Sequence, residues 1–324
     1  MTNWNALYDR LRAKVPALEL RRDEPMSRHT SFQVGGPVPL MALPKDEDEA
    51  RQVLSVAALE FGVKPFFMGR GTNLLVSDQG ADLLVVKAYD GLGRLELLPQ
   101  GERPGYRTVV AGSGVSLARL ASFALECGLA GLEFAQGIPG SVGGGVYMNA
   151  GAYGGEMGQV VSSVSSVSTP AEEDVREWRD PGFSYRHSRF QEQDDFILWA
   201  CFSLKPGDPA EIKAKMDDFS RRRREKQPLE YPSAGSTFKR PAPVDGQPVY
   251  AAALIDGCGL KGLTVGGAQV SEKHTGFVIN RGGATCDDIV QLMAQVRERV
   301  FRETGITLEP EVRYLGRGGE TWNF

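Results

Sequence analysis

In the first third of the chain, stretches with a helical period of apolar residues alternate with short apolar runs. Apolar residues recur at helical spacing over 46–61, where Asp46 and Glu49 have the spacing of an N-terminal capping box and Gly62 follows as a stop signal. A second helix is predicted over 116–127. Strands are predicted from the apolar runs at 63–68, through Leu75 and Val76, at 81–88 and at 107–112. This third of the chain therefore predicts a mixture of helices and strands.

The middle of the chain has a different pattern, dominated by glycine. Nine glycines lie within residues 137–158, and Ser/Val-rich strands are predicted from there to Leu204. Such a stretch is costly to order, because glycine loses more backbone freedom on folding than any other residue, and it is tolerated where the backbone must approach a large flat ligand. A disordered linker is the alternative, but the embedded Ile, Val, Tyr, Met and Asn residues argue against it. We expect a ligand-wrapping loop.

Helical periods return in the C-terminal third. The run Pro206-Gly-Asp-Pro209 predicts a boundary, followed by a helix that Asp208 caps and that leads into the basic run Arg221–Arg224. A last helix is predicted from the cap residue Thr285 to Gly305, with apolar residues 289, 292, 293, 296 and 300 in register. Residues 306–315 predict a closing strand.

Composition narrows the class of protein. The length of 324 residues suggests roughly two domains, and 41% hydrophobic with 24% charged residues is typical of a globular protein. A net charge of −4 argues against a nucleic-acid partner, and we see neither a signal peptide nor a membrane span. The four cysteines lie far apart and predict no metal site, so we expect buried thiols in a cytosolic protein.

Two glycine motifs resemble a dinucleotide fingerprint without completing it. The first, Gly69-x-Gly-Thr-Asn73, has Leu74 where the third glycine belongs, and a strand is predicted after it. The second, Gly112-Ser-Gly114, has Leu117 in that place. A Rossmann domain is therefore not favoured. A strand–glycine loop–strand still binds phosphate when its backbone N–H groups form an anion nest, and a plain tight turn is the other interpretation of residues 69–73.

Ser236 lies in Ala234-Gly-Ser-Thr-Phe-Lys-Arg-Pro241. This is not a G-x-S-x-G nucleophile elbow, because positions 234 and 238 are Ala and Phe. A serine beside cationic residues can instead donate a proton to an anionic substrate, or simply satisfy backbone groups of a turn.

Other candidate residues are also open to two interpretations. Arg186 offers a planar fork for a carboxylate or is a surface arginine, and nothing in its surroundings singles out His187 as a base. Glu311 shares one face of the predicted strand with Glu309 and Arg313, as exposed strand charges also do. The Arg221–Arg224 run becomes a pyrophosphate grip only if a nucleotide substrate is implied.

Eight motifs follow one another along the chain, from about residue 28 to residue 316. They are Thr30-Ser-Phe-x-Val-Gly-Gly36, Gly69-Arg-Gly-Thr-Asn-Leu-Leu-Val76, Gly137-Ile-Pro-Gly-Ser-Val-Gly-Gly144, Met148-Asn-Ala-Gly-Ala-Tyr-Gly154, Tyr185-Arg186 with Ser188-Arg-Phe190, 234–241, Leu254-Ile-Asp256 with Leu260-Lys-Gly262, and Leu308-Glu-Pro-Glu-Val312. In this order they resemble the UDP-N-acetylenolpyruvoylglucosamine reductases, the MurB family of cell-wall synthesis. Eight motifs in the right order are highly specific.

The resemblance implies an α+β flavoprotein with a two-part FAD-binding domain of the PCMH/vanillyl-alcohol-oxidase type, followed by a smaller α+β substrate-binding domain. We expect the two FAD subdomains at 1–90 and 91–205, and the substrate domain at 206–324. Loop 69–73 would hold the FAD pyrophosphate, and 137–151 would wrap the flavin. The expected cofactor residues are Thr30, Ser31, Gly69, Arg70, Gly71, Thr72, Asn73, Gly137, Ile138, Pro139, Gly140, Ser141, Gly143, Asn149, Ala150 and Gly151.

For catalysis the resemblance implies Arg186, Ser236 and Glu311, with NADPH as hydride donor. Arg186 and protonated Glu311 would stabilise an enolate of the enolpyruvyl substrate, and Ser236 would protonate its C2 carbon. Basic residues would bind the nucleotide-sugar substrate: Lys226, Lys239, Arg240 and Lys261. We expect a monomer.

Two departures from the family and two alternatives stay open. His29 stands where the family commonly has Asn, and the chain lacks the loop that carries a substrate-capping tyrosine in one branch. An oxygen-using oxidase on the same fold is one alternative, although many of those tether the flavin through a histidine and 69–73 has none. A flavin-binding module without catalysis is the other, and it would be expected to lose Arg186, Ser236 or Glu311.

Overall fold

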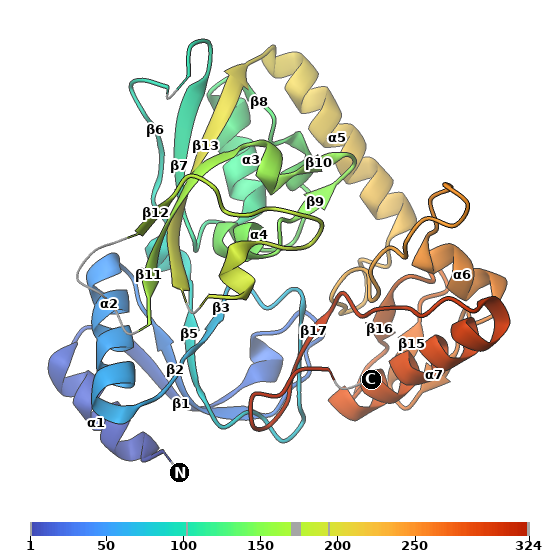
Figure 1. Cartoon of the computed structure of the whole chain (residues 1–324), viewed down its shortest axis with the longest axis horizontal. Coiled ribbons are helices and arrows are strands. Elements are labelled where there is room, and N and C mark those ends of the chain that lie inside the picture. The colour runs from blue at the N-terminus through green and yellow to red at the C-terminus, as the bar shows by residue number, and fades with distance from the viewer. Residues whose placement is uncertain (1, 102, 170–175, 194, 323–324) are drawn as a thin grey trace. The chain divides into compact units, whose positions relative to one another are not determined.

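The computed structural model describes residues 2–101, 103–169, 176–193 and 195–322, and it mixes helices with strands as the α+β class requires (Figure 1). The chain divides into two compact units. The first contains Met1–Arg22, Leu40–Arg70 and Leu83–Arg223, and the second contains Asp23–Pro39, Gly71–Asp82 and Arg224–Phe324.

The first unit holds most of the secondary structure. Its helices are α1 (Trp4–Lys14), α2 (Glu47–Ser55), α3 (Leu117–Glu126), α4 (Val142–Tyr147) and most of α5 (Pro209–Lys226). Its strands are β3 (Phe66–Met68), β5 (Leu84–Lys87), β6 (Leu95–Leu97), β7 (Arg107–Gly112), β8 (Leu129–Ala130), β9 (Gly151–Ala152), β10 (Gly155–Glu156), β11 (Val161–Ser168), β12 (Arg176–Trp178) and β13 (Asp195–Pro206). Strands β1 (Glu19–Pro25) and β2 (Pro37–Leu43) continue from one unit into the other.

A four-stranded sheet with the order β1-β2-β5-β3 occupies the N-terminal part, and β5 pairs in parallel with β2 and β3. The helix expected over 46–61 is confirmed. The Asp46 side chain accepts a hydrogen bond from the Glu49 N–H, and α2 continues into a π-helical turn, Val56–Glu60, before Gly62. The Glu49 carboxylate in turn accepts from the Lys45 N–H, which is one residue before the position that the capping box predicts.

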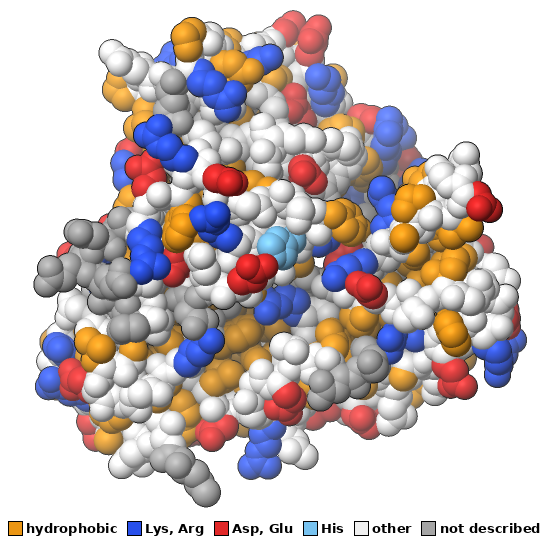
Figure 2. Space-filling model, viewed as in Figure 1, with side chains coloured by type: hydrophobic (Ala, Val, Ile, Leu, Met, Phe, Trp, Pro, Cys, Tyr) orange, Lys and Arg blue, Asp and Glu red, His pale blue; other side chains and the backbone are white. Residues whose placement is uncertain are grey.

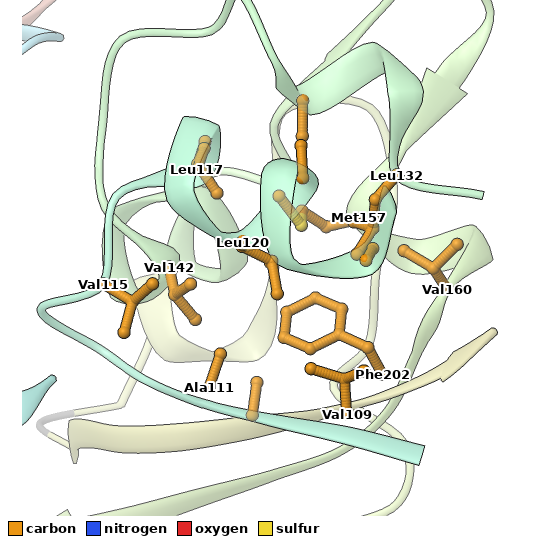
Figure 3. Close-up of a cluster of buried hydrophobic side chains, with 14 of the residues drawn as sticks. Val109, Ala111, Val115, Leu117, Leu120, Leu132, Val142, Met157, Val160 and Phe202 are labelled. Atoms are coloured by element: carbon orange, nitrogen blue, oxygen red, sulfur yellow. The ribbon is translucent and has the colours of Figure 1, made fainter. Parts of the chain in front are cut away.

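An antiparallel sheet with the order β12-β11-β13-β7-β6 forms the larger layer of the first unit, with β8 paired to β13. Helices α3 and α4 pack against it. Figure 3 shows Leu117 and Leu120 of α3, Val142 of α4 and Phe202 of β13 gathered in one buried cluster. Apolar side chains buried in this way provide the main stabilising contribution to the layer. Residues 170–175 and 194, which fall within the span expected as strands, lie outside the described residues.

The glycine-rich segment 137–158 is not the continuous loop that we expected. Its middle forms helix α4, whose sequence is Val-Gly-Gly-Gly-Val-Tyr, and its end forms the two-stranded hairpin β9–β10. Glycine disfavours helix, but Val142 and Val146 are fully buried in the core of the first unit, and this tertiary packing outweighs the local propensity.

The second unit is smaller. It contains a 3-10 turn (Met26–Arg28), β4 (Leu74–Val76), α6 (Ala251–Gly257), β14 (Thr264–Val265), β15 (Ala268–Val270), β16 (Val278–Asn280), α7 (Cys286–Thr304) and β17 (Arg313–Leu315). Strands β14, β15 and β16 form an antiparallel sheet, and β17 pairs in parallel with β4. The predicted helix 285–305 is confirmed with both ends, because Thr285 and Asp288 form a capping box and Gly305 is left-handed.

Two expectations differ from the structure in extent. The strand expected over 306–315 has regular pairing only at β17, and Pro310, which has no N–H group, lies before it in an isolated bridge to Phe238. The three expected domains remain a prediction, but the compact units divide the chain differently. Short segments 23–39 and 71–82 join the second unit, and most of α5 belongs to the first.

Charges of both signs are interspersed on the face of the molecule that Figure 2 displays. Blue Lys and Arg side chains alternate there with red Asp and Glu side chains among the described residues. This face does not resemble the one-sided basic surface that binds nucleic acid. Within the described part of the chain, no helix is long and apolar enough to cross a membrane, and no group of three or more His, Cys, Asp and Glu side chains is arranged to hold a metal ion.

Candidate active site

Arg186 lies at the tip of a tight hairpin turn in the first unit. Ser184 and His187 exchange both backbone hydrogen bonds at 3.1 Å, so Tyr185 and Arg186 are the two loop residues. The φ angle of Arg186 is +55°, a left-handed conformation that is uncommon for residues other than glycine. Backbone strain at a polar residue persists only where the surroundings hold it, and it is often found at functional sites.

Polar contacts to the glycine-rich segment hold this turn in place. The Asn149 amide donates to the Ser184 carbonyl at 2.8 Å, and its oxygen accepts from the Gly158 N–H at 2.9 Å. The Arg186 guanidinium donates to the Gly151 carbonyl at 3.3 Å. Asn149 is fully buried and also left-handed, with φ +42°. Asn149, which was predicted to contact the cofactor, therefore uses its side chain to position the Arg186 turn.

Gly69 and Ser141, both predicted to contact the cofactor, lie side by side in the first unit. A Cβ atom on Gly69 would be 2.3 Å from the Ser141 Oγ, so only glycine fits there without movement. The Ser141 hydroxyl is buried and has no hydrogen-bond partner within the described residues. Buried polar groups are normally paired, so this hydroxyl fits a ligand that brings an acceptor, as the phosphates of FAD do.

The other predicted cofactor residues of the first unit have mixed environments. Gly140 accepts from the Leu117 N–H, and Ala150 donates to the Gly145 carbonyl, so their backbones help to fold the segment. Gly143 packs so closely on Ser113 that a Cβ atom there would be 2.8 Å from the Ser113 Cβ. Gly137 faces Arg223, Ile138 is half-buried, and Arg70 and Pro139 are exposed.

The second unit supplies the remaining part of the predicted cofactor loop. The Ser31 N–H donates to the Gly71 carbonyl at 3.2 Å, and the buried Ser31 Oγ has no partner within the described residues. Thr30, by contrast, already uses its hydroxyl, which donates to the Val34 carbonyl at 2.7 Å. His29, which stands in place of the family's usual Asn, is buried and contacts the Glu24 carboxylate through its Nε2 atom at 2.8 Å. The environment of Ser31 is therefore the one that fits a cofactor.

Glu311 and the Ser236 segment are joined by strand-like pairing in the second unit. The Glu311 N–H donates to the Thr237 carbonyl at 2.9 Å, and the Lys239 N–H donates to the Glu309 carbonyl at 2.8 Å. Ser236 is exposed, whereas its neighbour Thr237 is 1% exposed. This pairing brings two of the three predicted catalytic residues into adjacent segments. The third, Arg186, belongs to the first unit.

Asn73 connects the predicted cofactor loop to Glu311. Its amide donates to the Glu311 carbonyl at 3.1 Å, and its own carbonyl accepts from the Arg313 N–H at 3.0 Å. Strands β4 and β17, which follow Asn73 and Glu311, are parallel, so the residues before them lie at the same edge. Thr72 immediately precedes Asn73 in this loop. The backbone of Glu311 is therefore held on one side by Thr237 and on the other by Asn73.

The predicted substrate-binding cations each have different surroundings. Lys239 pairs with Glu309 and Lys261 with Asp256, each at 3.4 Å, and the Arg240 guanidinium lies 5.1 Å from the centre of the Tyr250 ring. Lys226 is exposed at the end of α5. Of the arginine run, Arg222 pairs with Asp218 at 2.7 Å, while Arg223 packs on Gly137, where burial lowers the pKa of its guanidinium.

The residues that hold the Ser236 segment from its other side were not among those predicted. The Thr237 N–H donates to the Gly276 carbonyl at 2.8 Å, the Thr237 Oγ1 accepts from the Val278 N–H at 2.9 Å, and His274 accepts from the Gly276 N–H at 3.2 Å. The contacts of Thr237 with Gly276 and Val278 are long-range in sequence, so no local pattern indicates them. The only available signal was that His274 is one of three histidines in the chain.

Two family models match successive parts of the chain. A model described as "FAD binding domain" matches residues 38–171, and one described as "UDP-N-acetylenolpyruvoylglucosamine reductase, C-terminal domain" matches residues 227–315. The first match covers the glycine-rich segment and its unpartnered Ser141 hydroxyl. The protein is therefore of the FAD-binding class.

Full-length relatives narrow this class further. The chain is 43% identical to the UDP-N-acetylenolpyruvoylglucosamine reductase of Caldanaerobacter subterraneus subsp. tengcongensis, over 96% of this chain and 98% of the relative, and 44% identical to that of Thermotoga petrophila, over 91% and 98%. A crystal structure of UDP-N-acetylenolpyruvylglucosamine reductase (MurB) from Thermus caldophilus matches with a TM-score of 0.75 at 31% identity, covering 92% of this chain and 99% of that one. The chain belongs to the UDP-N-acetylenolpyruvoylglucosamine reductase family, which confirms the predicted resemblance and fold.

Proposed function

We propose that this protein reduces the enolpyruvyl ether of UDP-N-acetylglucosamine to UDP-N-acetylmuramate, using NADPH, in the synthesis of peptidoglycan precursors. The observation that carries the proposal is the backbone hydrogen bonding of the Ser236–Lys239 segment with Glu309–Glu311, which brings the backbones of Ser236 and Glu311 into adjacent segments. The membership of the family and the FAD-binding domain support it.

The residues around the cofactor have a binding and positioning role. The backbone of 69–73 and the hydroxyls of Ser31 and Ser141 would hold FAD, since both hydroxyls are buried without a partner within the described residues. Bound FAD would supply the hydride chemistry, with NADPH as the hydride donor and C3 of the enolpyruvyl vinyl group as the acceptor. Gly69 keeps a side chain out of this region, since a Cβ atom there would lie 2.3 Å from the Ser141 Oγ.

The three predicted catalytic residues act on the enolpyruvyl group. Addition of hydride at C3 builds negative charge at C2 and in the adjacent carboxylate. The Arg186 guanidinium, with its planar fork, and Glu311 in its protonated form stabilise this charge with hydrogen bonds aimed at the carboxylate. Ser236 then donates its hydroxyl proton to C2. An alcohol is a weak acid, but C2 is by then strongly basic, so Ser236 needs accurate positioning more than a changed acidity.

Binding of the nucleotide part is assigned to cations at exposed positions. Lys226 is exposed at the end of α5, and Lys239, Arg240 and Lys261 lie on the second unit. The two exposed ion pairs, Lys239–Glu309 and Lys261–Asp256, are worth little in water, about 0–1 kcal/mol each, so a diphosphate competes for these lysines at small cost. We expect the protein to be a monomer in the cytosol.

The experiment that tests this function measures NADPH consumption by the purified protein under low oxygen, with and without UDP-N-acetylglucosamine enolpyruvate. We expect consumption that depends on the enolpyruvyl compound and is stoichiometric with it. If NADPH reduces the flavin but only oxygen reoxidises it, the protein is an oxidase and the substrate assignment is wrong. If the flavin binds but NADPH does not reduce it, the non-catalytic alternative is correct.

A further inference from the structure

His274 lies in the turn between strands β15 and β16, and its ring is fixed by its neighbours. The ring meets the Phe277 ring edge-on, with centroids 4.8 Å apart and an interplanar angle of 67°, and Phe277 is 4% exposed. The Ser271 hydroxyl accepts from the Lys273 and His274 N–H groups, at 3.2 and 3.3 Å. The imidazole therefore has one defined orientation within the second unit.

The Nδ1 atom of His274 accepts a hydrogen bond from the Gly276 N–H at 3.2 Å. The fit is close, since a Cβ atom on Gly276 would lie 3.0 Å from His274 Cε1 and 3.1 Å from Nδ1. An imidazole that accepts through Nδ1 must carry its proton on Nε2 and be neutral. Burial, with a further contribution from the positive charge of Lys226, lowers the pKa of His274 and so favours this neutral form.

Gly276 passes this constraint to the Ser236 segment. Its carbonyl accepts from the Thr237 N–H at 2.8 Å, and that N–H belongs to the peptide group that joins Ser236 to Thr237. On the other side of Ser236, Gly235 has a φ angle of +78° and nothing lies within 4 Å of where its Cβ would be. The Thr237 peptide is thus a hydrogen-bonded group directly next to Ser236, and it bears on the orientation of the Ser236 side chain.

We infer that His274 is a positioning residue for proton transfer, because its Nδ1 atom holds Gly276, and Gly276 holds the peptide group that orients the Ser236 hydroxyl. The inference rests on the proposed function, in which Ser236 donates a proton to C2. A proton donor displaced by about 1 Å loses about 100-fold in rate. Loss of the His274 Nδ1 acceptor, which is two hydrogen bonds away from the Ser236–Thr237 peptide, should therefore slow proton transfer from Ser236.

Three substitutions separate the hydrogen bond from the packing of the ring. His274→Phe keeps an aromatic ring against Phe277 but has no acceptor. His274→Asn has no ring but places its Oδ1 atom the same number of bonds from the backbone as Nδ1. His274→Ala has neither. Each variant is prepared with FAD bound, and the rates of flavin reduction by NADPH and of flavin reoxidation by UDP-N-acetylglucosamine enolpyruvate are measured separately.

We expect flavin reduction to stay within about twofold of the unsubstituted protein in all three variants. Reoxidation should fall about 10- to 100-fold in the Phe and Ala variants, in its maximal rate rather than in the substrate concentration at half-saturation, and recover to within about threefold in the Asn variant. A role in packing alone predicts that Phe is the mildest change. The inference is overturned if Asn is no better than Phe, or if both half-reactions fall together.

A second measurement does not depend on the reaction. Amide hydrogen exchange at Gly276 and Thr237 reports whether their N–H groups are held, so exchange should accelerate in the Phe and Ala variants and stay slow in the Asn variant. Unchanged exchange at both positions in the Ala variant would overturn the linkage itself. If the linkage holds but the unsubstituted protein never transfers hydride to the enolpyruvyl compound, the proposed function fails, and the positioning role of His274 in proton transfer fails with it.

Discussion

The two units hold their predicted catalytic residues by different means. In the first unit, Arg186 occupies a left-handed turn, and side-chain hydrogen bonds from Asn149 and from Arg186 itself tie this turn to the glycine-rich segment. In the second unit, Ser236 and Glu311 depend on backbone hydrogen bonds between strand-like segments, through Thr237. The Arg186 turn is thus tied to the glycine-rich segment through side chains that can be replaced, whereas the Ser236 and Glu311 segments are joined mainly by backbone hydrogen bonds, to which the Asn73 amide adds one side-chain contact.

Replacement of Ser236 should cause the largest loss of activity. Ser236→Ala removes the proposed proton donor, and because the segment is held by its backbone, the fold and the flavin content should not change. Loss of a general acid costs about 10²- to 10⁴-fold, so flavin reoxidation by the enolpyruvyl compound should fall by that factor while reduction by NADPH stays constant. Rapid-mixing absorbance of the flavin measures both rates. Ser233→Ala, the same change three residues earlier, is the control, and an equal loss in both half-reactions would refute the role of Ser236.

A buried thiol tests the packing of the second unit. Cys286 of the second unit is 3% exposed, and burial, together with the negative charges of Asp78 and Asp287, raises its pKa to about 12 from an ordinary 9.0. Since the thiolate is the reactive form, this lowers its thiolate fraction at pH 8 by about 10³-fold. Pulsed alkylation followed by mass spectrometry of peptides should therefore label Cys286 in the unfolded chain and hardly at all in the native one. Rapid native labelling of Cys286 would contradict the burial of α7.

Arg186→Lys tests the catalytic residue of the first unit, since it keeps the positive charge and removes the planar fork of the guanidinium. We expect kcat/KM for the enolpyruvyl compound to fall about 100-fold, which is typical for the loss of one aimed donor to a developing anion. Steady-state kinetics under low oxygen checks this. Arg179→Lys is the control, since Arg179 is 87% exposed and should tolerate the change. A decrease of less than threefold at Arg186 would indicate that its charge alone matters.

The smallest effect concerns the glycines of α4. In Gly143→Ala the new methyl group meets the Ser113 Cβ at 2.8 Å, whereas in Gly144→Ala the nearest atom, the Ser141 Oγ, lies at 3.7 Å. Both changes favour helix equally, so without FAD the Gly143→Ala variant should have a lower free energy of unfolding than the Gly144→Ala variant, by about 1–3 kcal/mol, the cost of overpacking. Denaturant unfolding measures the difference. Equal stability would show that α4 can move away from Ser113.

Prediction from sequence succeeded where the signal is local. Helix α7 has its apolar period, its cap Thr285 and its terminal Gly305 within one segment, and the structure confirms all three. It failed for α4, because three glycines in six residues carry no helical signal and the helix exists through the burial of Val142 and Val146. At the candidate site, the motifs indicated Ser236 and Glu311, but their roles stay predictions. Neither the dual hold on Glu311 nor the contribution of His274 was visible in the motifs.

The sequence by itself determined the mixed fold, the caps and turns, and the family, because periodicity and eight ordered motifs are readable within short windows of residues. Only the tertiary structure decided which distant segments pair: 236–239 with 309–311, β4 with β17, and Gly276 with Thr237. Pairing of this kind depends on the register of backbone hydrogen bonds, and every residue except proline offers the same donor and acceptor. The register therefore depends on how buried side chains such as Phe238 and Leu308 pack in the core of the second unit.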